Sequence, residues 1–89
     1  MNNDIGRGGA EMRERTPRFI VTFHTTAEAM ATERVCRERG LAGKLISAPR
    51  ALSADCGIAW SAPPDERAAI EAALAEERIE AAGFYELVT

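Results

Sequence analysis

The chain has 89 residues, of which 46% are hydrophobic and 28% charged, and its formal net charge is −3. A chain of this length builds one hydrophobic core, and this composition is typical of a globular domain. The acidic balance argues against non-specific binding to nucleic acid, which needs a basic face, and no apolar run is long enough to cross a bilayer. The opening residues carry no apolar secretion signal, so we expect a cytoplasmic protein without a membrane partner.

The first 17 residues differ in composition from the rest of the chain. They carry three glycines among charged side chains and offer almost nothing to bury, so residues 1–17 are predicted to form a disordered N-terminal tail. A single domain is expected over residues 18–89. It opens with a strand, because residues 18–23 are dense in β-branched and aromatic side chains.

A helix is predicted directly after this strand. Residues 25–28, Thr-Thr-Ala-Glu, match a capping box, in which a threonine oxygen and a glutamate carboxylate bind the free amides of a helix start. Gly40 ends the helix after about Arg39. Cys36 lies off the centre of the apolar stripe and is expected to be partly buried without a chemical role. The stripe itself is predicted to contain Ala27, Met30, Ala31 and Val35.

Three more strands and a second helix are predicted in the remaining sequence. The strands cover residues 44–48, about 56–61 and 83–88, and Pro49 ends the first of them because proline lacks the amide that a ladder needs. The helix opens at residues 63–66, where proline and acids suit a first turn. Its apolar stripe contains Ala69, Ile70, Ala73 and Leu74. The order βαββαβ predicts a ferredoxin-like α+β fold, a four-stranded antiparallel sheet of strand order 4-1-3-2 with both helices on one face.

Cys56 is the residue whose chemistry is the strongest candidate for the function. It lies in the polar run of residues 53–57, directly before the third predicted strand. In a ferredoxin-like sheet the start of strand three meets the end of strand one, so Cys56 is expected near His24 and near the start of the first helix. If the register pairs Phe23 with Gly57, His24 faces Cys56 on one side of the sheet, and a slip of one residue removes that alignment.

Three groups are expected to favour a Cys56 thiolate: the side chain of His24, the positive end of the first helix, and Arg50 on the intervening loop. Asp55, the immediate neighbour, opposes them. Each residue also has a structural interpretation that the sequence leaves open. In that interpretation Cys56 fills a half-buried apolar position, His24 is hydrogen-bonded to the helix cap, and Arg50 is a solvated loop charge.

The alternation of side chains along the strands predicts a second surface. The small side chain of Ala59 is expected under the helices, on the same side as Val21. Ile20, Ile58 and Trp60 then share the open face of the sheet, where they form an apolar patch suited to a homodimer contact.

Several kinds of site are disfavoured by the residues present. Two cysteines and one histidine do not supply the four ligands of a structural zinc site, so no metal is expected, and nothing in the sequence indicates a cofactor. A disulfide between Cys36 and Cys56 is disfavoured by a reducing compartment. A Ser-His-Asp triad is not credible with one histidine and no suitably placed acid. A stand-alone enzyme is therefore the least favoured function.

Four short motifs carry a resemblance over the stretch from about Phe19 to Leu87. They are Thr22-Phe23-His24-Thr25-Thr26 followed by Ala29-Met30, Pro49-Arg50 with Leu52-Ser53, Cys56-Gly57 with Ala59, and Gly83-Phe84-Tyr85. With them the chain resembles the family of small proteins known as "putative selenium/sulfur carrier-like". The resemblance implies a role in sulfur or selenium handling, with Cys56 as the residue that bears the chalcogen and with donor and acceptor proteins as partners. The Cys-Pro helix-start motif of the better understood sulfur-relay carriers is absent from this chain.

Two functions therefore remain open on the sequence. In the first, Cys56 accepts sulfur or selenium and passes it to a partner protein. In the second, the domain is a non-enzymatic module that binds a ligand or dimerises, and Cys56 is structural.

Overall fold

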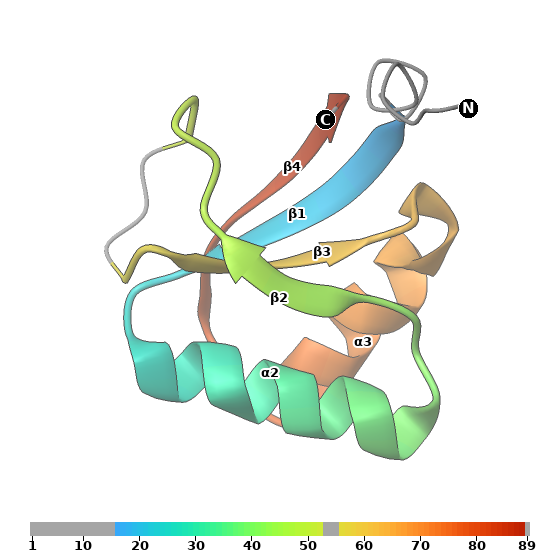
Figure 1. The fold of residues 1–89 in the computed structure, drawn as a ribbon. Helices are drawn as coiled ribbons and strands as arrows, with labels where there is room; N and C mark the ends of the chain where they lie inside the picture. The colour runs from blue at the N-terminus through green and yellow to red at the C-terminus, as the bar shows by residue number, and fades with distance from the viewer. Residues whose placement is uncertain (1–15, 53–55, 89) are drawn as a thin grey trace, which may run out of the picture.

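The chain folds as a four-stranded antiparallel sheet with two helices in a computed structural model, which describes residues 16–52 and 56–88 (Figure 1). In chain order the elements are β1 (Pro17–Phe23), α2 (Thr26–Arg39), β2 (Lys44–Ser47), β3 (Ile58–Ala62), a 3-10 helix (Pro64–Glu66), α3 (Arg67–Glu76) and β4 (Ala81–Val88). The sheet order is β2-β3-β1-β4. The predicted ferredoxin-like α+β fold is confirmed, since this is the predicted strand order counted from the opposite edge.

The ends of β1 and β4 extend the sheet beyond the predicted bounds. Pro17 already pairs with Val88, and β4 begins at Ala81, two positions before the predicted start. The predicted tail, apart from its last two residues, lies outside the described residues. Within residues 16–52 and 56–88, no helix has both the length and the apolar character that a membrane span requires.

Both ends of α2 follow the predicted capping chemistry. Thr25 is the N-cap, and its hydroxyl accepts the Glu28 backbone N–H at 3.2 Å while the Glu28 carboxylate accepts the Thr25 N–H at 3.3 Å. Gly40 closes the helix in the left-handed conformation, with φ of 72°. The capping box and the glycine stop therefore fix where α2 begins and ends.

The buried face of α2 differs from the predicted stripe. Ala27 and Met30 are exposed, Met30 by 50%. Thr32 is buried instead, because its hydroxyl donates to the Glu28 carbonyl at 2.9 Å and so needs no water. The buried residues are Ala29, Thr32, Val35 and Cys36. A helix that presents small side chains can pack close to a sheet, and this preference outweighs the larger apolar surface of Met30.

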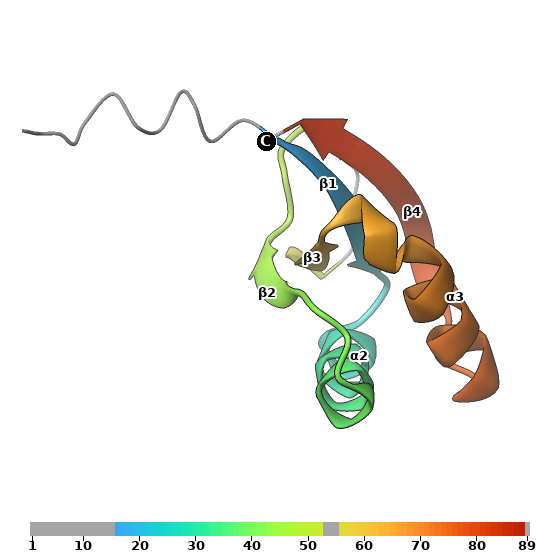
Figure 2. The same ribbon diagram turned by 90° about the vertical axis from the view of Figure 1, so that its right-hand side faces the viewer.

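The second helix follows its prediction more closely. Residues 64–66 form a 3-10 turn, and α3 then buries Ile70, Ala73 and Leu74. Ala69, which was expected in the same stripe, is exposed. As Figures 1 and 2 show, α2 and α3 cover the same face of the sheet.

The register between β1 and β3 differs by one residue from the conditional prediction. Val21 lies opposite Trp60, and Ile20 lies opposite Ser61. Because side chains alternate along a strand, this slip moves every β3 side chain to the other face. Trp60 therefore packs under the helices, where it is 3% exposed, and Ile58 packs partly against the same core.

The predicted apolar patch on the open face is therefore wrong. Ile20 lies on that face but is completely buried, and its two β3 neighbours there are Ala59 and Ser61. The physical reason is the size of the indole. Placing Trp60 between the sheet and the helices removes more apolar surface from water than placing Ala59 there. The buried cluster on the helix side contains Phe19, Val21, Phe23, Ala29, Cys36, Trp60, Ala62, Ile70 and Leu74.

Candidate functional site

Cys56 lies just outside the end of the β2–β3 hairpin. The Ala48 N–H donates to the Gly57 carbonyl at 2.9 Å and closes the hairpin there. Gly57 has φ of 75°, a left-handed conformation that favours glycine, so the chain turns sharply between Cys56 and β3. The Cys56 side chain is half-buried and packs against the edge of the helix-side core. It is a free thiol that is neither enclosed nor fully in solvent.

Among the described residues, the sulfur of Cys56 has a hydrogen-bond partner in β3. Its thiol donates to the Ile58 carbonyl oxygen at 3.3 Å. A thiolate has no proton to donate, so this hydrogen bond is made only by the thiol form. Nucleophilic attack by the sulfur therefore requires this hydrogen bond to break first. Ser53, Ala54 and Asp55, which belong to the run singled out in the sequence, lie outside the described residues.

His24 connects β1 to the capping box of α2. It is exposed, and its backbone N–H donates to the Glu28 carboxylate at 3.1 Å, beside the bond from Thr25. The Glu28 carboxylate therefore lies at the amino end of α2. Its negative charge offsets the positive helix end that was expected to favour a thiolate. The structure therefore weakens the expected contribution of the helix end.

The observed register changes how His24 and Cys56 are related. Continued past the ladder, it places Gly57 opposite His24, so the condition for His24 to face Cys56 is not met. Both residues still lie at the same end of the two central strands, because His24 follows the end of β1 and Cys56 precedes the start of β3.

Arg50 lies on the loop that joins β2 to β3. A turn positions it, in which the Leu52 N–H donates to the Pro49 carbonyl at 3.0 Å. Arg50 is exposed, and within residues 16–52 and 56–88 its guanidinium has no hydrogen bond or ion pair. A cation without an internal partner is available for an anionic ligand that reaches this loop.

Cys36 has the opposite environment. It is completely buried on α2, where partial burial was expected. Burial chiefly, and then the negative charge of Glu66, raise the pKa of the Cys36 thiol from 9.0 to about 11, a value that Arg39 keeps from rising higher. A thiol that is shielded and almost fully protonated at neutral pH is chemically inert.

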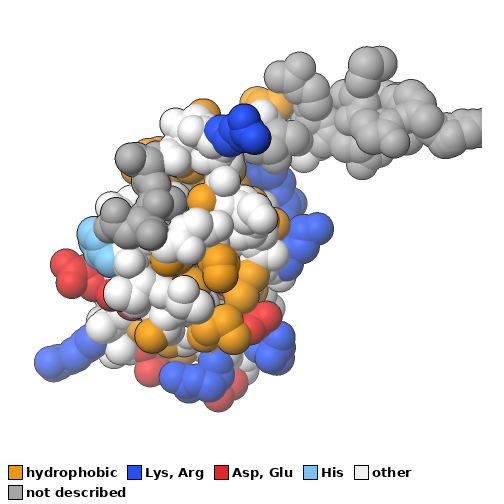
Figure 3. Space-filling view, turned by 60° about the vertical axis from the view of Figure 1, so that its left-hand side comes forward, with side chains coloured by type: hydrophobic (Ala, Val, Ile, Leu, Met, Phe, Trp, Pro, Cys, Tyr) orange, Lys and Arg blue, Asp and Glu red, His pale blue; other side chains and the backbone are white. Residues whose placement is uncertain are grey.

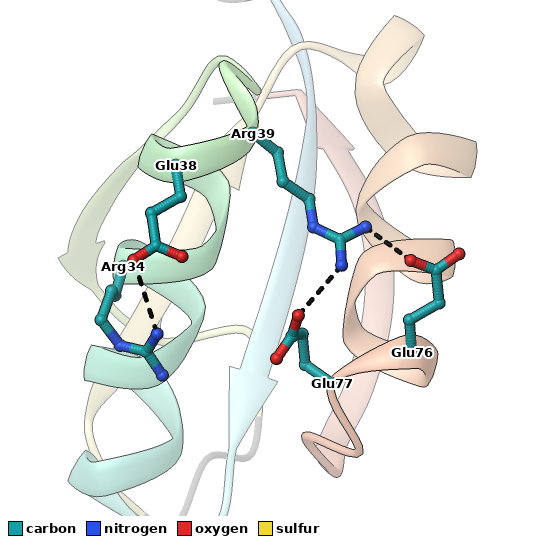
Figure 4. A network of polar contacts seen from close by, with 5 residues as sticks. All are labelled: Arg34, Glu38, Arg39, Glu76 and Glu77. Carbon is teal, nitrogen blue, oxygen red and sulfur yellow. Dashed lines mark hydrogen bonds and ion pairs between the residues drawn. The ribbon is translucent and has the colours of Figure 1, made fainter.

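Arg39 also ties the two helices together. Figure 4 shows its guanidinium reaching from the last turn of α2 to Glu76 at 2.7 Å and to Glu77 at 3.0 Å. Arg34, by contrast, pairs within α2 with Glu38 at 3.6 Å. Both arginines lie on α2, but Arg34 pairs within this helix whereas Arg39 connects it to the end of α3.

A family model described as "Putative Se/S carrier protein-like" matches residues 18–86. The chain belongs to this family. The resemblance found in the sequence is thereby confirmed, and the matched span contains Cys56, His24 and Arg50. No curated protein and no solved structure matches the chain.

The family's name points to selenium or sulfur as cargo, and the described residues offer no cluster of a kind that binds metals. Within residues 16–52 and 56–88, no group of three or more histidine, cysteine or acidic side chains is arranged to hold a metal ion. Cys36 and Cys56 are both free thiols.

A cavity that the sequence did not predict lies between α2 and the start of β2. It has a volume of about 240 Å³ and is lined by Glu33, Arg37, Leu41, Gly43, Lys44 and Trp60. Gly40 was expected only to end the helix, and no local signal marked the contact of Gly43 with Trp60. On the face shown in Figure 3, hydrophobic side chains reach the surface with acidic and basic side chains beside them.

Proposed function

We propose that this protein carries sulfur or selenium on Cys56 as a persulfide or selenosulfide. The observation that supports this most directly is the contrast between the two thiols. Cys36 is completely buried with a pKa raised to about 11, whereas Cys56 is half-buried at a loop end. Membership of the family supplies the nature of the cargo. A carrier needs one reachable thiol and a docking surface rather than an enclosed substrate site, which suits a domain of this size.

The proposed loading step is a thiol exchange on sulfur. The Cys56 thiolate attacks the outer sulfur of a donor persulfide, a new S–S bond forms on Cys56, and the donor S–S bond breaks. The electron pair leaves with the donor thiolate, so no external oxidant or reductant is required. Unloading is the same displacement, in which an acceptor thiolate attacks the outer sulfur and Cys56 leaves as a thiolate.

His24 and Arg50 are proposed to assist this exchange from the two chain segments beside Cys56. The imidazole of His24 takes the thiol proton, a role that suits a histidine near neutral pH. The guanidinium of Arg50, which has no partner among residues 16–52 and 56–88, neutralises the anionic outer sulfur of the loaded form. Breaking the Cys56 contact with the Ile58 carbonyl precedes both steps, because that contact holds the proton on sulfur.

Mass spectrometry of the intact protein after incubation with a small-molecule persulfide tests this proposal. The wild type is expected to gain the mass of one sulfur atom, reversibly on treatment with a thiol. Cys36→Ala is expected to gain the same mass, and Cys56→Ser is expected to gain none. A Cys56→Ser protein that still gains the mass, or a wild type that gains none, contradicts the carrier function.

The hydrogen bond from Cys56 to Ile58 favours a second candidate. In it the domain is a non-enzymatic binding module, and Cys56 joins the loop to the start of β3. Cys56→Ser retains a donor for that carbonyl, so this module predicts that the substitution leaves partner capture unchanged. The carrier predicts that acceptance of sulfur is lost while the fold is retained.

A further inference from the structure

The cavity between α2 and β2 has an aromatic wall held in place by a glycine. A side chain at Gly43 would place its first carbon 2.5 Å from the Trp60 indole, and Gly43 has φ of 145°. Only a residue without a side chain fits both the contact and the backbone conformation. The main chain at Gly43 and the indole are therefore in direct contact beside the cavity that both residues line.

The Trp60 ring carries a polar atom that lacks a partner. Its Nε1 is the only buried side-chain nitrogen or oxygen among the described residues without a hydrogen bond, and the Gly43 backbone lies against this atom. A buried N–H without an acceptor is costly and uncommon. Because the Gly43 backbone covers this atom, an acceptor atom in the cavity reaches it and supplies the missing bond once the chain at Gly43 shifts aside.

The charges around the cavity favour a negative ligand. Arg37 and Lys44 are basic and Glu33 is acidic, which leaves one net positive charge among the lining residues. Glu33 pairs with Arg37 at 3.1 Å, and this bond uses one of the two terminal nitrogens of the guanidinium. Lys44 has no ion pair with any described residue.

We propose that this cavity binds a small organic anion, a carboxylate with a flat apolar body. The body lies against the Trp60 indole and Leu41, and the carboxylate is attracted by Arg37 and Lys44 and accepts the indole N–H. A volume of about 240 Å³ admits a ligand of the size of one substituted ring. This site does not involve Cys56 and goes beyond the proposed carrier function.

Benzoate is a suitable probe, and Trp60 is a built-in reporter because it is the only tryptophan in the chain. Its indole N–H gives a single side-chain signal in a ¹H–¹⁵N correlation spectrum. Titration with benzoate is expected to move that signal and the Gly43 amide signal saturably, with the same dissociation constant. Benzamide, which has the same shape without the charge, is expected to bind about tenfold more weakly, as the loss of a charge-assisted hydrogen bond implies.

Two arginine variants on α2 distinguish the effect of a cation in the cavity from the effect of the protein's net charge. Arg37→Gln removes a lining cation and is expected to weaken benzoate binding by about threefold to tenfold. Arg34→Gln removes an arginine from the same helix that also pairs with a glutamate four residues away but does not line the cavity, and it is expected to leave binding unchanged. The dispersed amide spectrum verifies that both variants are folded.

Three results would overturn the proposal. One is the absence of a saturable shift of the Trp60 and Gly43 signals with benzoate. Another is equal affinity for benzoate and benzamide, which would leave no role for the cations. The third is an equal loss of affinity in Arg34→Gln and Arg37→Gln, which would assign the effect to net charge.

Discussion

The two cysteines of this chain occupy environments that differ in almost every physical respect. Cys36 lies on α2 within the core, where low polarity and Glu66 hold the thiol protonated. Cys56 lies at the loop end of the β2–β3 hairpin, where its thiol donates one hydrogen bond to the Ile58 carbonyl. The first thiol is restrained by the whole fold, whereas the second is restrained by one local contact. The comparison teaches that the reactivity of a cysteine depends on how much structure must move to release it.

The largest expected difference between the two sites is in chemical reactivity. Modification of Cys36 requires the core to open, so its labelling by a thiol reagent should be at least about a thousandfold slower than that of Cys56. Two variants that each retain one cysteine, Cys36→Ala and Cys56→Ser, allow the rates to be measured separately. Similar labelling rates in the two proteins would contradict the claim that Cys36 is shielded by the core and Cys56 is not.

A second difference is expected in the pH dependence of stability. The folded pKa of Cys36, about 11, lies above the 9.0 of an unfolded thiol, so its contribution is fully present below about pH 9 and is lost as the pH rises to about 11. The loss should amount to about 2–3 kcal/mol of unfolding free energy.

Urea denaturation of the wild type and of Cys36→Ala, at matched pH values across this range, measures that contribution. The difference in unfolding free energy between the two proteins should shrink toward alkaline pH. A difference that stays constant would show that Cys36 is not the titrating group, since all other groups are shared.

A smaller difference is expected when each thiol is replaced by a hydroxyl. Cys36→Ser places a hydroxyl in an apolar site and should cost about 1–3 kcal/mol. Cys56→Ser keeps a donor for the Ile58 carbonyl and should cost less than about 1 kcal/mol. Thermal or urea unfolding checks both values, and equal costs would mean that the hairpin end is as tightly packed as the core.

The smallest expected effect is a change in the pKa of Cys36 when a neighbouring charge is removed. Arg39 lowers the pKa of this thiol, so Arg39→Gln should raise that pKa further. Arg34→Gln is the matched control, because Arg34 pairs with Glu38 within α2 and does not influence Cys36. The alkaline limb of the stability curve is the measurement. An identical shift in both variants would attribute the effect to net charge rather than to Arg39.

The fold was predictable because local signals mark most of its boundaries. The capping box at Thr25 and Glu28 and the left-handed Gly40 place α2 to the residue, and the order of elements then leaves few topologies. The sheet register was not predictable from such signals. The alternation in β3 permits Trp60 on either face, and only the space between the helices and the sheet decides between them.

The sequence predicted which residues of the candidate site lie near one another, but not the contacts that their side chains make. Chain order alone brings the end of β1 to the start of β3, and hence His24 toward Cys56. The hydrogen bond from Cys56 to Ile58 depends on side-chain placement that no local pattern encodes. The cavity beside Trp60 was missed for the same reason, because it arises from a contact between distant segments.

The bond between Ala48 and Gly57 has a consequence for how this protein can diversify. It closes the sheet below the loop that bears Arg50 and Cys56, so the pairing of β2 with β3 does not depend on the sequence of that loop. Lengthening such a loop costs little, about 0.6 kcal/mol for each doubling. Substitutions and insertions in this loop are therefore expected to leave the β2–β3 ladder and the core intact.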